Sequence, residues 1–190
     1  EVYTYNPKTK IWKLFADGLH EPLGIIAEDN HTLVVMQRPE LTRLRDTDGD
    51  GEADHYQTIS DDFGMTGNYH EFAFGPARDK DGNYYVGLNL ASSGASIRPE
   101  IRGEFRHYGI SREQFYKNHK AGSGRMYSAT PYRGWIMKIA PDGKTTPFAS
   151  GFRSPNGVNF DAQGRLWATD NQGDWLGTSK LFHVKENNFH

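Results

Sequence analysis

The chain has 190 residues, of which 36% are hydrophobic and 24% charged, with a formal net charge of −2 and no cysteine. No apolar run of about 18 residues is present, so no membrane-spanning helix is expected. The lack of cysteine excludes disulfides, thiolate metal sites and covalent haem attachment within these residues. We also expect no nucleic-acid partner. Abundant glycine and aromatic residues favour many short strands joined by tight turns.

The N-terminal quarter contains the first copies of two repeated patterns. Phe15–Ile25 carries Phe, Ala, Gly, Pro and Gly at spacings that return 133 residues later in Phe148–Val158. A turn followed by a short apolar strand occupies residues 30–35, and the same pattern recurs at 81–86 and 163–168. Repeats of about 40–50 residues built from short strands are typical of β-propeller blades.

An acidic loop follows at residues 46–54, with strand-like residues on both sides. Asp46, Asp48 and Asp50 alternate, Gly51 permits a sharp turn, Glu52 offers its backbone carbonyl, and Asp54 stands at the ninth position of a calcium loop. The twelfth position is Gln57, so the usual bidentate glutamate is missing. We expect a calcium ion here in a mainly structural role; the alternative is an acidic turn without metal.

His70 precedes the next expected strand and its Asp81-Gly82 hairpin turn. In a propeller, side chains at such a position can face the central channel, where a neutral imidazole can take a proton from a substrate hydroxyl. A hydrogen-bonded structural role for His70 remains open.

An insertion separates the second and third turn motifs, at about residues 91–131. The stretch from 98 to 133 contains eight Lys/Arg and three Glu, so it is basic in an otherwise acidic chain. Ser111–His119 is the one segment that predicts a helix, because Ser111 can cap it, Gln114 follows three residues later and Gly122 lies beyond its end.

Polar residues flank the strands of the last repeat. Arg153 and Asn156 precede one strand, and Asp170 and Asn171 follow the next. Arginine suits carboxylates or reducible carbonyl groups, and Asp or Asn oxygens suit a metal or sugar hydroxyls. We expect Arg153, Asn156, Asp170 and Asn171 to bind a cofactor, and simple turn-forming roles remain open for these residues.

These patterns predict an all-β fold. We expect about three blades of a β-propeller over residues 1–190, interrupted by a loop and short-helix insertion. A propeller closes with about 4–8 blades. The rest of the ring is therefore expected from a longer chain or from a partner.

The chain resembles the pyrroloquinoline-quinone (PQQ)-dependent sugar dehydrogenases, the soluble glucose, aldose and sorbosone dehydrogenases with six-bladed propellers. It looks most like the large dehydrogenase-like proteins of planctomycete-type bacteria, which often add helical repeats and a c-type haem domain. The resemblance is carried by four pieces: Gly18 to Gly24, Thr42 to Gly51, His70 with Phe74-Gly75-Pro76, and Phe148 to Asn171.

This resemblance implies specific roles. His70 falls where the family places the base that accepts the hydroxyl proton as hydride passes to the quinone. Arg153 falls where an arginine contacts the reactive carbonyl region of the quinone. The chain has Ser154 between Arg153 and Pro155 where the family commonly has Asn, and Glu71 after the histidine where the family usually has a small residue.

Three functions therefore remain open. The first is a quinone- and calcium-dependent oxidoreductase acting on a sugar or a related alcohol or aldehyde, with a c-type cytochrome as electron acceptor. The second is a metal-dependent gluconolactonase-like hydrolase, which Pro155-Asn156-Gly157 and Asp161 also resemble. The third is a non-catalytic, calcium-stabilised propeller that binds carbohydrate or protein. Because such a calcium loop fills best in millimolar calcium, we expect a periplasmic or exported protein.

Overall fold

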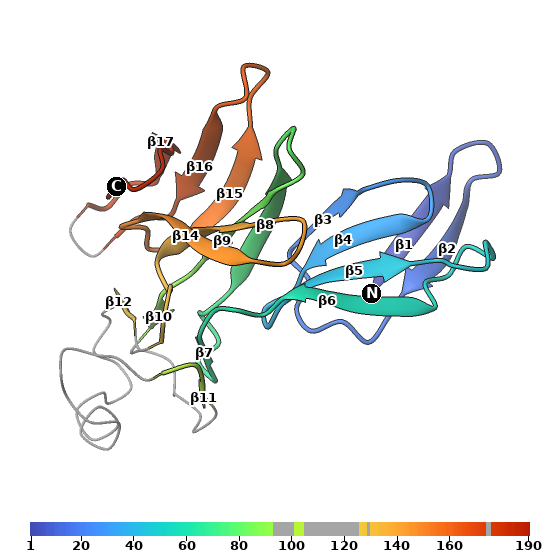
Figure 1. Cartoon of the computed structure of the whole chain (residues 1–190), viewed down its shortest axis with the longest axis horizontal. Coiled ribbons are helices and arrows are strands. Elements are labelled where there is room, and N and C mark those ends of the chain that lie inside the picture. Colours follow the sequence, from blue (N-terminus) through green and yellow to red (C-terminus); the bar gives the residue numbers. More distant parts are fainter. Residues whose placement is uncertain (93–100, 105–125, 129, 174–175) are drawn as a thin grey trace.

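The computed structural model describes residues 1–92, 101–104, 126–128, 130–173 and 176–190. Every regular element in these ranges is a β-strand, numbered β1 to β17 (Figure 1). None of the described elements is a helix that could cross a membrane. The helix expected at residues 111–119 lies outside the described residues.

The first complete sheet has four antiparallel strands in chain order. Its strands are β3 (Gly24–Ala27), β4 (Thr32–Met36), β5 (Leu41–Arg45) and β6 (His55–Ser60). The turn motif at 30–35 forms the β3–β4 hairpin, and the acidic loop connects β5 to β6. This sheet is blade 1.

The second sheet repeats the same order around the insertion. It consists of β8 (Ala73–Arg78), β9 (Tyr84–Leu88), β13 (Trp135–Ile139) and β14 (Thr145–Ser150). The insertion separates β9 from β13, yet these two strands pair directly over five residues. Blade 2 is therefore intact, and the insertion leaves the sheet between its second and third strands.

Incomplete sheets lie on either side of these two blades. One has three strands, β15 (Pro155–Phe160), β16 (Leu166–Asp170) and β17 (Lys180–His183), and forms blade 3. The other is a two-stranded ribbon of β1 (Val2–Asn6) and β2 (Ile11–Ala16). Because β2 leads into β3 as β14 leads into β15, the ribbon corresponds to the outer half of a preceding blade.

The first strands of the three blades lie side by side. Strand β8 contacts both β3 and β15, and Figure 1 shows it between them. The approach is closest at glycines: a β-carbon on Gly24 would overlap the carbonyl oxygen of Gly75, and one on Gly87 would overlap that of Pro155. Four-stranded antiparallel sheets whose first strands adjoin are the architecture of a propeller. The prediction of an all-β propeller with about three blades is confirmed.

Apolar side chains fill the spaces between successive sheets. Strand β9 is buried on both faces, because Tyr84 and Val86 join the cluster toward blade 1 while Tyr85 joins the cluster toward blade 3. A third cluster holds the β1–β2 ribbon against blade 1 and consists of Phe15, Ala16, Val35 and Leu44. Because both faces are buried, the sequences of these strands are continuous apolar runs and do not alternate strictly between apolar and polar residues.

A polar contact also joins blades 1 and 2. Glu28, in the β3–β4 turn, accepts hydrogen bonds from Arg43 Nε at 2.6 Å and from the Tyr84 hydroxyl, and lies 3.5 Å from Arg78. Burial by itself raises the pKa of Glu28, but the hydrogen bonds from Arg43 and Tyr84 outweigh it, so the pKa is lowered. Glu28 is therefore ionised at neutral pH and links the two sheets.

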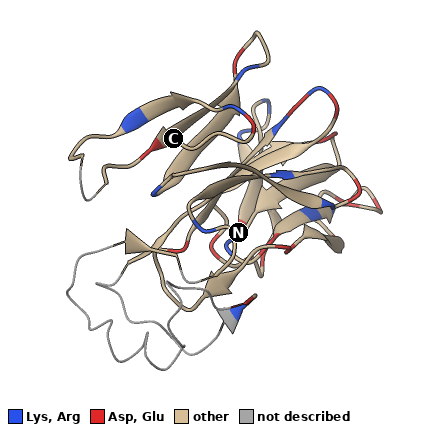
Figure 2. Ribbon diagram, turned by 60° about the vertical axis from the view of Figure 1, so that its left-hand side comes forward, with Lys and Arg blue, Asp and Glu red and all other residues tan. Residues whose placement is uncertain are grey.

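Four very short strands gather at one end of the blades. They form two pairs: β7 (Met65–Thr66) with β11 (Ile101–Arg102), and β10 (Ala91–Ser92) with β12 (Met126–Tyr127). Figure 1 shows them together, at the start of β8. Charged residues lie largely on connecting loops and strand ends, and strand centres are mostly uncharged (Figure 2). We call the end that carries these four strands the mouth.

Candidate functional site

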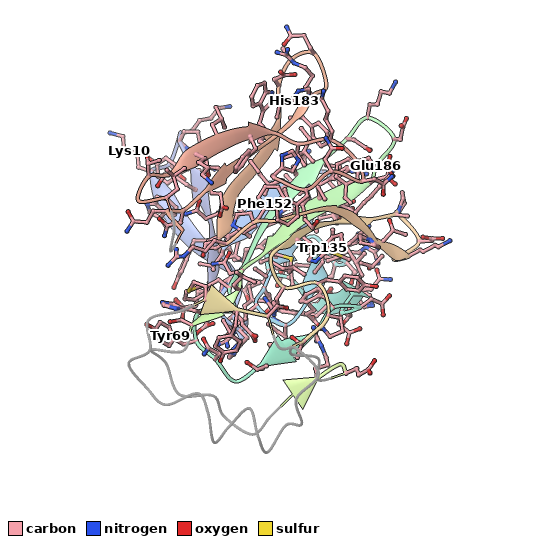
Figure 3. All side chains as sticks on the ribbon, turned by 90° about the vertical axis from the view of Figure 1, so that its left-hand side faces the viewer. Lys10, Tyr69, Trp135, Phe152, His183 and Glu186 are labelled. Atoms are coloured by element: carbon pink, nitrogen blue, oxygen red, sulfur yellow. The ribbon has the colours of Figure 1, made fainter. Side chains whose placement is uncertain are left out.

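His70 lies at the mouth, in the segment that leads into β8. Its backbone N–H donates to Asn68 Oδ1 at 3.0 Å, and its ring lies 4.2 Å from that of Tyr69. Figure 3 shows Tyr69 at the end of the molecule where the short strands gather. The Nδ1 atom of His70 is buried and has no hydrogen-bond partner. Burial, followed by the charge of Arg153, lowers the pKa of His70, so the neutral imidazole prevails at pH 7.

Arg153 occupies the equivalent place before β15. Its backbone N–H donates to Asp170 Oδ2 at 2.9 Å, and its carbonyl accepts from Leu90 N at 2.9 Å. The side-chain Nε is buried without a partner. His70 and Arg153 thus lie just before two adjacent inner strands, β8 and β15, and the charge of Arg153 contributes to the lowered pKa of His70.

Asp170, predicted to bind a cofactor, holds the backbone of this segment. Its Oδ1 accepts from Ser154 N at 2.6 Å and from Asn171 N at 3.0 Å, in addition to the Oδ2 bond from Arg153. The side chain is 5% exposed. Three backbone donors on one buried carboxylate make Asp170 a positioning residue for Arg153.

Blade 1 contains the same arrangement with different residue types. Gln37 Oε1 accepts from the backbone N–H of His20 at 2.6 Å. Residues 20 and 153, and residues 37 and 170, are both separated by 133 positions, the offset of the sequence repeat. In blade 2 the direction is reversed, because Arg133 donates to the backbone carbonyls of Glu71 and Phe72. A side chain thus fixes the segment before each inner strand.

The other two residues predicted to bind a cofactor make local contacts. Asn156 Oδ1 accepts from Thr169 Oγ1 at 3.1 Å, and Asn171 Oδ1 accepts from Gln172 N at 2.9 Å. Both side chains are exposed. Neither has a hydrogen bond with His70 or Arg153 among the contacts of the described residues.

Three of the five predicted metal ligands gather in the β5–β6 loop. Asp46, Asp48 and Asp50 each offer an oxygen, and these atoms lie within 4.8 Å of one another. Asp46 is 6% exposed and accepts from Gly49 N at 2.7 Å and Gly51 N at 3.0 Å. Gly51 has φ of +89°, the left-handed turn that the sequence predicts. The donor set is that of a hard cation.

The side chains of Asp54 and Glu52 have other partners, although Glu52 is expected to bind through its backbone carbonyl. Asp54 accepts from Thr47 N at 3.1 Å and from Thr47 Oγ1 at 2.6 Å, which closes the base of the loop. Glu52 lies 3.6 Å from Lys13 on β2, and Lys13 also donates to the backbone carbonyl of Asp50. The loop therefore contacts the β1–β2 ribbon as well as its own sheet.

Several charged residues are buried at the mouth, and their burial is not predicted by the sequence. Glu71 is fully buried, Arg133 is 2% exposed and Arg38 is 7% exposed. Glu71 Oε2 accepts from Thr66 N, while its Oε1 has no partner. Charged residues are rarely buried, and no periodic signal distinguishes them from surface charges. The one available signal was the charged residue directly after His70.

A protein-family model described as "Domain of unknown function (DUF7133)" matches residues 9–180. The chain belongs to this DUF7133 family. No curated protein matches the DUF7133 chain.

Several solved structures are similar to the DUF7133 chain. Two glucose dehydrogenases each show 12% sequence identity, with TM-scores of 0.49 and 0.48; the alignments cover 93% of this chain and 65% and 64% of those chains. The PQQ-bound form of aldose sugar dehydrogenase from Streptomyces coelicolor shows 15% identity and a TM-score of 0.36, with 93% and 64% covered. The DUF7133 chain thus spans less than two thirds of their length. Its assignment as a propeller rests on its own strand order.

Proposed function

We propose that the chain is part of an oxidoreductase that oxidises a sugar, or a related alcohol or aldehyde, with a PQQ-type quinone and calcium. The observation that carries the proposal is the pair of unpartnered buried atoms, His70 Nδ1 and Arg153 Nε, at the starts of two adjacent inner strands. Buried polar atoms without a partner are uncommon in folded proteins. Two such atoms before adjacent strands favour a polar ligand that supplies the missing partners.

The chemistry follows from the charge states of these groups. A bound quinone supplies the hydride acceptor. The neutral imidazole of His70 accepts the hydroxyl proton of the substrate, and its lowered pKa keeps it free to do so at pH 7. The guanidinium of Arg153 donates to oxygens that gain negative charge. Asp170 holds Arg153 in place through its backbone, while Asn156 and Asn171 offer amide groups to a ligand at the exposed rim.

Calcium has a structural role in this proposal. The carboxylates of Asp46, Asp48 and Asp50 would bind the calcium ion in the β5–β6 loop, and the bound ion would relieve the repulsion among them. Lys13 reaches the same loop, and Ala53 N donates to Phe15 O on β2 at 2.7 Å. Filling the loop therefore stabilises the contact between blade 1 and the β1–β2 ribbon.

Two further parts of the proposal concern the cell. A loop of this kind fills best in millimolar calcium, which favours a periplasmic or exported protein. Electrons must leave the reduced quinone, and a c-type cytochrome or haem domain is the acceptor that the family resemblance implies. The remaining blades would come from further chain or from a partner.

The test is dye reduction by the purified protein with PQQ, Ca²⁺ and glucose or another aldose. His70→Asn should abolish turnover because it removes the base. The matched control is His183→Asn, which should leave turnover unchanged. His183 lies in β17 and stacks on Trp167 of β16. Lactone hydrolysis without dye reduction would replace the proposal with a metal-dependent hydrolase. Within the described residues, the only group of three or more His, Asp or Glu side chains that could hold a metal is the β5–β6 loop. Inactivity in both assays would favour a binding propeller.

A further inference from the structure

Three arginines at the mouth have a buried side-chain nitrogen without a hydrogen-bond partner. The atoms are Arg38 Nε, one terminal nitrogen of Arg133 and Arg153 Nε. They come from three places in the chain, each two residues outside a strand: after β4, before β13 and before β15. The guanidinium group cannot deprotonate to escape burial at ordinary pH. Each of these nitrogens is therefore a buried donor that lacks an acceptor.

Arg133 is the most buried of the three. Its Nε donates to Gly64 O at 2.8 Å, and one terminal nitrogen donates to Glu71 O at 3.1 Å and to Phe72 O at 3.2 Å. All these acceptors are neutral carbonyls. Burial lowers the pKa of Arg133 to about 10; the charges of Arg38 and Arg102 lower it too, and only Glu71 opposes them. Within the described residues, Arg133 thus has no carboxylate among these hydrogen-bond partners, and Glu71 is the one negative charge that opposes the shift.

Arg38 approaches the same segment from the other side. One terminal nitrogen donates to Thr66 O and Asn68 O, and the other lies 3.3 Å from Glu21 Oε2. Glu21 is exposed, with 42% of its side chain accessible, so water screens this pair. Arg38 and Arg133 therefore both bind the segment of residues 64–72, which also carries His70, and Arg153 adds a third positive charge.

We infer that the mouth binds a carboxylate, and that the substrate is accordingly a sugar acid instead of a neutral sugar. A carboxylate provides two planar acceptor oxygens, which match the guanidinium geometry, and a negative charge that compensates buried cations. The inference rests on the proposed function for the site. It adds the chemical class of the substrate, since the anionic group would lie at the arginines while a hydroxyl faces His70.

The experiment compares glucuronate with glucose, which share a ring and differ in a carboxylate at C6. Binding of each sugar is measured by isothermal titration calorimetry without quinone. One charge-assisted hydrogen bond predicts about tenfold or greater preference for glucuronate. Arg38→Gln should reduce the preference to about threefold or less, because the charge is removed, while Arg38→Lys should retain part of it. Thermal melts establish that both variants are folded.

Arg165→Gln is the matched control. Arg165 lies in the β15–β16 hairpin turn, where its side chain is 52% exposed and lies 2.6 Å from Asp161, and its replacement should leave the preference unchanged. Equal affinity for the two sugars, or a preference that survives Arg38→Gln, would overturn the inference. So would loss of glucuronate binding after loading with PQQ, since the arginines would then serve the carboxylates of the quinone. Turnover of a neutral aldose with no glucuronate binding would contradict the sugar-acid inference and leave the proposed function standing. Glucuronate binding without any dye reduction would contradict only the proposed function.

Discussion

Replacing Asp170 with alanine tests the role of this residue in holding the Arg153 segment. The substitution removes the acceptor for the backbone N–H groups of Arg153 and Ser154, which are bonded at 2.9 and 2.6 Å. Leaving a buried donor unsatisfied costs about 1–3 kcal/mol, so two donors predict a loss of about 2–6 kcal/mol in the free energy of unfolding. The third donor, Asn171 N, belongs to an exposed residue and can bond to water.

The assay is urea denaturation followed by tryptophan fluorescence, with calcium present throughout. Asp170→Asn should fall between alanine and wild type, because it keeps one acceptor oxygen but turns an amide N–H₂ toward a backbone donor. Asn156→Ala is the matched control, since its exposed side chain bonds only to Thr169, and it should change stability by about 0.5 kcal/mol or less. A loss below about 1 kcal/mol in Asp170→Ala would refute the reasoning.

Three further predictions concern the contacts between sheets. Glu28→Gln should lower the free energy of unfolding by about 1.5–3 kcal/mol at pH 7, because it removes the charged acceptor for Arg43. The folded-state pKa of Glu28 lies below its ordinary value of 4.5. The difference in unfolding free energy between variant and wild type should therefore be full above pH 4.5 and shrink as the pH falls below it. A difference that stays constant from about pH 7 to about pH 3 would contradict the ion pair. Gly24→Ala should destabilise by about 1–3 kcal/mol in the same assay, because the new methyl group overlaps the Gly75 carbonyl, and an unchanged midpoint would show that β3 and β8 lie farther apart. Chelation with EGTA should lower the melting temperature of the wild type and leave that of Asp48→Asn unchanged, whereas equal shifts in both would place the bound calcium elsewhere.

The repeat and the turns made most of the fold predictable from sequence. The motifs at 30–35, 81–86 and 163–168 form the inner hairpins of three blades. The 133-residue offset recovered blades 1 and 3, because both have short connections between their strands. Blade 2 was harder to recognise, since the insertion divides it and Arg133 replaces the side-chain acceptors found at Gln37 and Asp170.

The site was predictable only in part. Spacing identified Asp46, Asp48 and Asp50, because a loop with alternating carboxylates brings their oxygens to one point. It did not predict that Asp54 would close the loop through Thr47, since this depends on a side-chain rotamer. Arg38 and Arg133 gave no signal, because their partners include backbone carbonyls distant in the sequence, such as Gly64 for Arg133.

The decisive experiment is an NMR titration of the His70 imidazole, with its signals assigned by the His70→Asn variant. We expect a pKa below 6.5 in the wild type, a rise toward that value in Arg153→Gln, and no change in Arg165→Gln. A pKa at or above 6.5, or one that Arg153→Gln leaves unmoved, would show that the two side chains do not share a site.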